Sequence, residues 1–131
     1  MNGIIGKKLG MTSFYNEDGS VIPVTVIEAG PCVVVQKKNN EKDGYNAIQL
    51  GFESQKDSRL SKPKLGHYKK AGVDSKRILQ EFKIEENDET AVGDSVDVSI
   101  FSEIKFVDIL STGKGRGFQG VVKRYDFGGG R

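Results

Sequence analysis

Short apolar runs separated by turn residues recur along the chain and predict a sheet rather than a set of helices. Glycines at Gly6 and Gly10 predict a bend or a bulge in the first strand. The segment Asn16-Glu17-Asp18-Gly19-Ser20, with Asp-Gly at its centre, predicts a tight turn into the second strand. The expected strands cover residues 4–15, 21–28, 32–38, 45–52, 77–84, 96–100 and 104–110, with a polar loop at 39–44.

Residues 54–72 lose this pattern and contain Pro63, Gly66 and Gly72. This stretch is predicted to leave the sheet, with at most one short helix near Leu65–Ala71. Because strands follow one another with short links, the fold class is mainly β: an antiparallel barrel or sandwich rather than a βαβ arrangement. We expect a β domain over residues 1–110, with a basic insertion at about 54–76, and a glycine-rich basic extension over 111–131.

Composition narrows the class of protein. The chain has 131 residues, of which 36% are hydrophobic and 29% charged, which suits one soluble domain. No apolar run approaches the roughly 20 residues of a membrane helix, and no signal peptide is evident. We therefore expect a cytoplasmic protein without a membrane partner.

The chain has too few cysteine and histidine residues for a disulfide or for a Cys/His metal site. Cys32 and His67 are single examples of their residue types, so the chain offers neither an internal disulfide nor a Cys/His metal set. Cys32 lies in an apolar run and is expected to be a small buried hydrophobe rather than a nucleophile. No metal or cofactor is predicted, and the residue inventory is thin for an enzyme.

Charge is segregated along the chain although the net charge is only +2. Residues 54–80 carry 8 basic and 2 acidic side chains, and residues 109–131 carry 5 and 1. Between them, residues 81–108 carry 2 basic and 9 acidic side chains. Two basic blocks around an acidic one favour a polyanion-facing side and a solvated side, although surface charge that happens to cluster remains the alternative.

The last basic block contains a G-x-G-x-x-G pattern at residues 115–120. A dinucleotide site would need a following helix and an acidic residue about 20 positions further on. Val121–Tyr125 is too short for that helix, and its two valines favour an extended backbone. A phosphate-binding Walker loop fails too, because no glycine precedes Gly113 by five positions and Gly115 replaces the Ser/Thr. No small-molecule substrate is predicted.

The same residues suit RNA. Glycines let a backbone approach phosphates, and the flanking Lys114, Arg116, Lys123 and Arg124 are cationic. Phe118 and Tyr125 offer flat faces on which an exposed base can stack, although Phe118 in the core is an equal alternative. The first basic block supports the same interpretation; its candidate residues are Lys62, Lys64, His67, Lys69 and Lys70.

Three segments resemble the bacterial form of one family, the universal large-subunit ribosomal protein L-three (uL3) family. Residues 3–12, GIIGKKLGMT, look like its N-terminal signature, and residues 62–73, KPKLGHYKKAGV, are similar to its mid-chain basic segment. Residues 111–124, STGKGRGFQGVVKR, resemble the entry into its RNA-penetrating extension. The three matches occur in the family's order and span nearly the whole chain.

The resemblance implies a β-barrel of the translation-protein type with an inserted helical excursion. It implies a structural, non-catalytic role in the cytoplasmic ribosome: binding 23S-type large-subunit rRNA, helping to nucleate assembly and supporting the peptidyl-transferase region. Neighbouring large-subunit proteins are implied as further partners. The runner-up hypothesis is a free-standing, translation-associated RNA-binding barrel protein.

The resemblance implies RNA contacts at Lys7, Lys8, Lys114, Arg116, Lys123 and Arg124, whereas the lysines of residues 62–70 could instead face a protein or solvent. Relatives in the family are longer and return with strands that complete the barrel. We therefore expect the chain to lack its C-terminal part, which would leave an open sheet edge. The full candidate RNA-binding set is Lys7, Lys8, Lys62, Lys64, His67, Lys69, Lys70, Lys114, Gly115, Arg116, Gly117, Phe118, Gly120, Lys123, Arg124 and Arg131.

Overall fold

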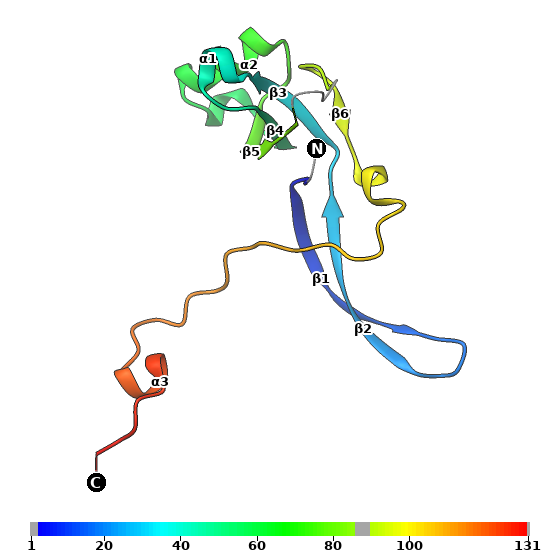
Figure 1. Ribbon diagram of the computed structural model, residues 1–131, viewed down its shortest axis with the longest axis vertical. Helices are drawn as coiled ribbons and strands as arrows, with labels where there is room; N and C mark the ends of the chain where they lie inside the picture. Colours follow the sequence, from blue (N-terminus) through cyan, green and yellow to red (C-terminus); the bar gives the residue numbers. More distant parts are fainter. Residues whose placement is uncertain (1–2, 86–89, 131) are drawn as a thin grey trace.

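Two antiparallel sheets form the folded part of the chain. The structure is a computed structural model that describes residues 3–85 and 90–130. A two-stranded sheet contains β1 (Gly6–Tyr15) and β2 (Val21–Ala29). A four-stranded sheet contains, in this order, β5 (Lys76–Lys83), β4 (Ala47–Ser54), β3 (Cys32–Lys38) and β6 (Ser95–Val96). Figure 1 shows the β1–β2 hairpin projecting from the larger sheet and a long tail leading away to the C-terminus. The predicted mainly β, antiparallel fold is confirmed. Across the described ranges strand pairing does not close a barrel, so closure stays a prediction.

The hairpin forms as the glycine and turn signals predict. Strands β1 (Gly6–Tyr15) and β2 (Val21–Ala29) pair along their whole length, with a register shift between Lys8 and Gly10. In the turn, Asn16 N donates to Ser20 O at 3.0 Å, and Gly19 has a φ of 79°. That left-handed backbone conformation favours glycine, which explains why the Asp-Gly pair lies at the tip.

The core lies in the four-stranded sheet. Its strands are β3 (Cys32–Lys38), β4 (Ala47–Ser54), β5 (Lys76–Lys83) and β6 (Ser95–Val96). Cys32 is completely buried, its thiol donates to Ile5 O, and burial raises the thiol's pKa. The predicted role of Cys32 as a small buried hydrophobe is therefore confirmed. The buried apolar cluster comprises Ile5, Cys32, Val34, Ile48, Leu50, Phe52 and Val96.

Gly30 joins the hairpin to this core. Its φ is 73°, and a Cβ atom there would lie 3.0 Å from Val96 O and 3.1 Å from Ile4 Cδ1. Its N–H donates to Ile5 O at 3.3 Å. A side chain would strain both the backbone and its neighbours, so glycine is what lets β2 pass into β3 beside the N-terminal segment.

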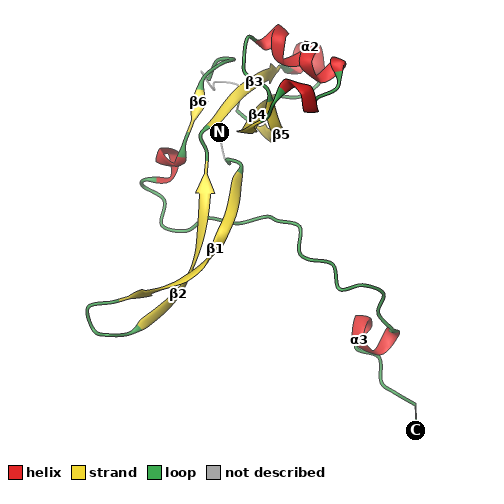
Figure 2. Cartoon of the chain, turned by 180° about the vertical axis from the view of Figure 1, so that it is seen from behind, coloured by secondary structure: helices red, strands yellow, loops and turns green. Residues whose placement is uncertain are grey.

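The helices are short and lie outside the sheets (Figure 2). They are α1 (Asn40–Asp43), η1 (Asp57–Arg59), α2 (Lys62–Ala71), η2 (Val98–Phe101) and α3 (Val121–Tyr125). The predicted excursion thus contains α2, which begins earlier than expected, and the 3₁₀ turn η1. The polar loop predicted at 39–44 is instead mostly the single turn α1, which ends at Gly44 with a φ of 81°.

Two predicted strands are wrong. Of the range 96–100 only Val96 belongs to a strand, the short β6, because Asp97 accepts hydrogen bonds from the backbone and hydroxyl of Ser99 and turns the chain into η2. Residues 104–110 form no strand and are fully in the exposed class. Valine and isoleucine favour strands, but a strand needs a partner for its backbone groups, and none lies beside this segment among the described residues.

The C-terminal stretch is extended and solvent-exposed. From residue 102 to 130 only Gln119 is partly shielded. The extended backbone predicted for Val121–Tyr125 is wrong: the segment forms α3, closed by a hydrogen bond from Arg124 N to Gly120 O at 3.0 Å. With no strand edge nearby, a local turn is the way in which these backbone groups find partners. None of the described helices is long and apolar enough to cross a membrane.

Replacing Leu50 with alanine should lower the free energy of unfolding by about 2–5 kcal/mol, because it leaves a cavity in a closed core. Urea denaturation of the full chain measures this change. Leu110→Ala is the matched control: Leu110 is 97% exposed, whereas Leu50 is 0% exposed. The control should stay within about 0.5 kcal/mol of the parent chain. Equal losses in the two variants would contradict the assigned core.

Candidate nucleic-acid interface

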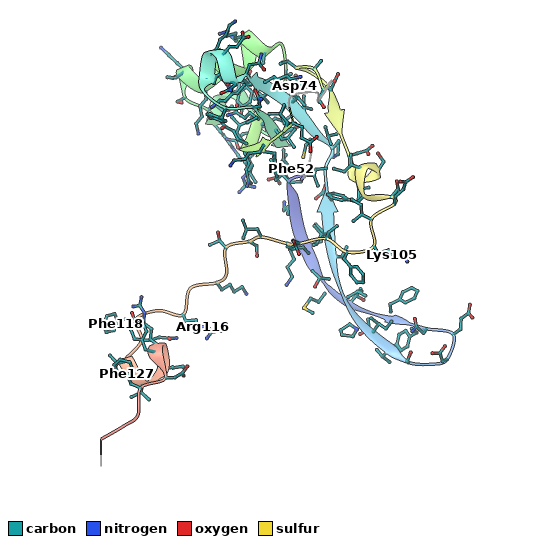
Figure 3. The ribbon with its side chains drawn as sticks, in the orientation of Figure 1. Phe52, Asp74, Lys105, Arg116, Phe118 and Phe127 are labelled. Atoms are coloured by element: carbon teal, nitrogen blue, oxygen red, sulfur yellow. The ribbon has the colours of Figure 1, made fainter. Side chains whose placement is uncertain are left out.

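The tail presents the densest group of predicted contact residues. Two of these residues, Lys123 and Arg124, lie on α3. The others lie on the non-helical backbone before it: Lys114, Gly115, Arg116, Gly117, Phe118 and Gly120. All are exposed. Figure 3 shows Arg116 on the stretch that leads into α3 and Phe118 beside that helix. No ion pair involves these four cations within residues 3–85 and 90–130. Their charge is therefore available to an external anion.

Aromatic side chains accompany the tail cations. The Arg124 guanidinium lies 5.2 Å from the centroid of the Tyr125 ring, and the rings of Tyr125 and Phe127 are 6.1 Å apart and tilted by 42°. Phe118 is fully exposed, so the alternative of a core position is wrong. Glycines Gly113, Gly115, Gly117 and Gly120 have nothing within 4 Å of the place where a Cβ would stand. Within residues 3–85 and 90–130, no part of the chain covers these surfaces.

Helix α2 carries the second group of predicted RNA-contact residues. Lys62, Lys64, Lys69 and Lys70 are all exposed. The helix is fixed at its C-terminal end, where Gly72 has a φ of 68° and the N–H of Val73 donates to Tyr68 O at 3.2 Å. Tyr68 is buried, and its hydroxyl donates to Lys76 O at 2.8 Å. The lysines are thus exposed on a helix that Tyr68 anchors to the sheet.

His67 faces the sheet rather than open solvent. Gln49 Oε1 on β4 accepts a hydrogen bond from His67 Nε2 at 2.7 Å, and the ring is half-buried. The ring also meets Tyr68 edge-on, with centroids 6.0 Å apart. Because one ring nitrogen and much of the ring are already engaged, the geometry supports a role for His67 in docking α2. Its predicted RNA contact stays untested.

Lys7 is engaged within the fold. Its Nζ donates to Glu53 Oε1 at 2.8 Å, and Arg77 donates to Glu53 Oε2 at 3.0 Å. The hydrogen bond from Lys7, with the charges of Lys7 and Arg77, holds the pKa of the Glu53 carboxyl below its usual range. Glu53 thereby ties β1 to β5. Its φ of 58° is unusual for a residue other than glycine.

The predicted residues fall into separate groups. Lys8 is exposed on β1, and Arg131 lies outside the described residues. Both ribbon views place α2 and α3 at opposite ends of the molecule (Figures 1 and 2). The two basic blocks of the sequence, residues 54–80 and 109–131, therefore form two distant basic surfaces, on α2 and on the tail, rather than one patch.

Two features of the site escaped the sequence analysis. Glu53 and Arg77, which engage Lys7, are 24 positions apart and carry no motif, so only the strand pairing of β4 with β5 brings them together. Phe127 was missed although its position two residues after Tyr125 was a usable signal. No group of three or more His, Cys, Asp or Glu side chains in the described ranges has a metal-binding arrangement.

Sequence identity with known proteins assigns the chain to a family. The chain is 54% identical over 130 residues to the large ribosomal subunit protein uL3 of Petrotoga mobilis, covering 99% of the chain and 61% of that protein. It is 51% identical over 130 residues to the large ribosomal subunit protein uL3 of Brachyspira pilosicoli, covering 99% of the chain and 60% of that protein. Over this shared length, the chain belongs to the uL3 family. No family profile matches it.

The uL3 relatives are longer than this chain, which spans about three fifths of their length. The shared part includes both basic surfaces, the hairpin and the core strands, because the alignments cover nearly every residue of the chain. The earlier resemblance on three motifs is thus confirmed at the level of the family.

Replacing Glu53 with glutamine should destabilise the chain at neutral pH and change how stability depends on pH. Because the folded-state pKa of Glu53 lies below its ordinary value of 4.5, its contribution is present above pH 4.5 and is lost as the pH falls through the folded-state pKa. The difference between the parent chain and Glu53→Gln should therefore shrink in acid. Urea denaturation across this pH range measures it.

Glu17→Gln is the control for that experiment, since Glu17 lies in the exposed hairpin turn. It removes the same charge without touching the Lys7–Glu53–Arg77 cluster. A difference for Glu53→Gln that stays constant down to strong acid would show that the carboxylate is not stabilised by its neighbours.

Proposed function

We propose that this chain is a structural constituent of the large ribosomal subunit that binds 23S-type large-subunit rRNA. The observation that carries the proposal is the exposed tail, whose four cations Lys114, Arg116, Lys123 and Arg124 lack ion-pair partners among the described residues. The names of the uL3 relatives supply the class of assembly. The proposed role is structural rather than enzymatic.

The tail suits a polyanion for electrostatic reasons. Like charges held close together repel one another unless counter-charges relieve them. Asp126 is the only acidic residue between residues 109 and 131, so internal pairing cannot balance the cations. Contact with phosphates releases condensed counterions from RNA, which favours binding at moderate salt. Glycine positions between the cations allow close backbone approach to those phosphates.

The separation of the basic surfaces favours a large folded RNA. Helix α2 and the tail lie at opposite ends of the molecule (Figure 1). A short oligonucleotide engages one surface at a time, whereas a long folded RNA has phosphates at both places. We propose Lys62, Lys64, Lys69 and Lys70 as the second contact set, with Lys8 as a contact on the hairpin.

The hairpin supports a role for neighbouring large-subunit proteins. Met11, Phe14, Tyr15 and Ile22 all expose large fractions of their side chains. Phe14 pairs with Ile22 and Tyr15 with Val21 in neighbouring registers, so apolar groups stand on both faces of the ribbon. Exposed apolar surface of this kind marks contacts with other polypeptide. We propose that such contacts cover it in the subunit.

The finer roles rest on the family resemblance. We propose that the tail reaches toward the peptidyl-transferase region and supports the rRNA there. We also propose that binding of the folded sheets to rRNA helps to nucleate subunit assembly. These roles place the protein in the cytoplasmic ribosome.

Expressed with an affinity tag in bacteria, the chain should co-sediment with large subunits and remain there through a high-salt wash. Contacts spread over both basic surfaces dissociate slowly as a unit. Sucrose-gradient fractions probed for the tag measure this. A chain that washes into the free-protein fractions would instead behave as a loosely associated factor.

Replacing Lys114, Arg116, Lys123 and Arg124 together with serine should weaken binding to large-subunit rRNA fragments by several kcal/mol, at roughly 1 kcal/mol per contact. The parent chain should show a log–log slope of affinity against salt of about −4 to −7, and the variant a slope smaller by about 3. Filter binding at several salt concentrations measures both quantities.

The control carries Lys42→Ser and Lys83→Ser, two exposed lysines outside both basic surfaces. It should keep the parent slope and affinity nearly unchanged. Circular dichroism should show the same strand content in all three proteins, because the tail contributes nothing to the core. Unchanged affinity in the tail variant would remove the tail from the interface.

A further inference from the structure

We propose that the tail recognises an unpaired RNA base by stacking on Phe118, in addition to holding phosphates. This inference rests on the proposed function and deepens it, because it adds a base-binding surface to an electrostatic one. The ligand class is a single bulged or looped-out nucleobase rather than a paired helix. The contributions of base stacking and phosphate binding to affinity can be separated by experiment. Stacking needs a flat exposed ring, whereas phosphate binding needs positive charge.

Phe118 is the most exposed large apolar side chain that the structure describes, at 102% of its reference area. Burying a phenylalanine ring is worth roughly 1.5–3 kcal/mol relative to leaving it in water, so a partner surface gains from covering it. The buried cluster lies in the four-stranded sheet and the N-terminal segment, far along the molecule from the tail (Figure 3). The ring is therefore available to a partner outside the chain.

The backbone around Phe118 keeps its faces clear. Gly117 has a φ of 71°, which turns the chain immediately before the ring. Neither Gly117 nor Gly120 has another group within 4 Å of its would-be Cβ position. Gly120 is the N-cap residue just before α3, and Arg124 N donates a hydrogen bond to its carbonyl oxygen at 3.0 Å. A turn on one side and a helix on the other thus hold the ring at a bend with open space beside it.

Cations and further rings accompany Phe118. Arg116 precedes it by two residues, and Arg124 already stacks on Tyr125 at 5.2 Å. The Tyr125 and Phe127 rings lie 6.1 Å apart at the C-terminal end of α3. Flat rings beside arginines suit a ligand that is both aromatic and anionic, which describes a nucleotide.

An apolar groove on a protein fits this surface less well. Such a groove would bury the Phe118 ring but would leave Lys114, Arg116, Lys123 and Arg124 to be desolvated without counter-charges, which is costly. A paired RNA helix fits less well too, because its bases are stacked within the duplex and do not offer a face to Phe118. An unpaired base joins the ring and the cations in one ligand.

The test uses the full chain and three RNA duplexes: one with a single bulged 2-aminopurine, one with an abasic residue at the bulge, and one fully paired. Phe118→Leu removes the flat face and keeps an apolar side chain. It should weaken binding to the bulged duplex by roughly 5- to 150-fold, the effect of losing one base stack. Binding to the abasic and paired duplexes should not change. Fluorescence anisotropy measures the affinities.

Phe118→Trp gives an independent readout, because the chain has no other tryptophan. The indole retains a flat face, so this variant should keep the parent affinity. Its emission should be quenched by the bulged base and not by the abasic duplex. Equal emission changes on both duplexes would overturn the stacking proposal.

Phe106→Leu is the matched control. Phe106 is 90% exposed but lies outside the tail surface defined by residues 114–127, so this variant should bind all three duplexes like the parent chain. If Phe118→Leu binds the bulged duplex as tightly as the parent, stacking is overturned while salt-dependent binding keeps the proposed function. If the parent chain binds no RNA at any salt concentration, both proposals fall.

Discussion

Burial of one small apolar cluster is the constraint on which the rest of the structure depends. Val34, Ile48 and Leu50 are completely buried between the central strands and the N-terminal segment. This cluster is too small to bury the apolar side chains of the hairpin and the tail. The hairpin shares only its base with the core through Gly30, and the tail shares nothing with it. Apolar side chains on both are therefore exposed.

Whether a charged side chain has a partner also depends on whether it lies beside the folded sheets. Lys7 at the start of β1 binds Glu53 on β4, and the antiparallel pairing of β4 with β5 brings Arg77 to the same carboxylate. The cations of the tail have no such neighbours, since that segment pairs with no strand in the described part of the chain. Lys114 and Arg116 lie exposed on non-helical backbone interrupted by glycine, and Lys123 and Arg124 lie exposed on α3. Exposed cations spread along a glycine-rich segment are suited to contacting a polyanion. One type of residue thus has two roles, depending on whether a sheet neighbour is present.

Hydrophobic alternation and turn chemistry predicted the strands that have partners. The ranges expected for β2, β3 and β4 agree with the structure within about two residues, as did the bulge in β1 and the Asp-Gly turn. The segment at 104–110 has equally strand-like letters but forms no strand. Local propensity alone does not supply the neighbouring strand that a β-strand needs for its backbone hydrogen bonds.

The sequence by itself determined the antiparallel β class, the family, and the positions of both basic surfaces, because these depend on residue types and their spacing. Tertiary structure alone decided that Lys7 is engaged by Glu53, that His67 faces Gln49, and that Phe118 stands in solvent rather than in the core. Those outcomes depend on which distant segments meet in space. The spacing of residues along the chain does not reveal these long-range contacts, because they form only when the strands pair.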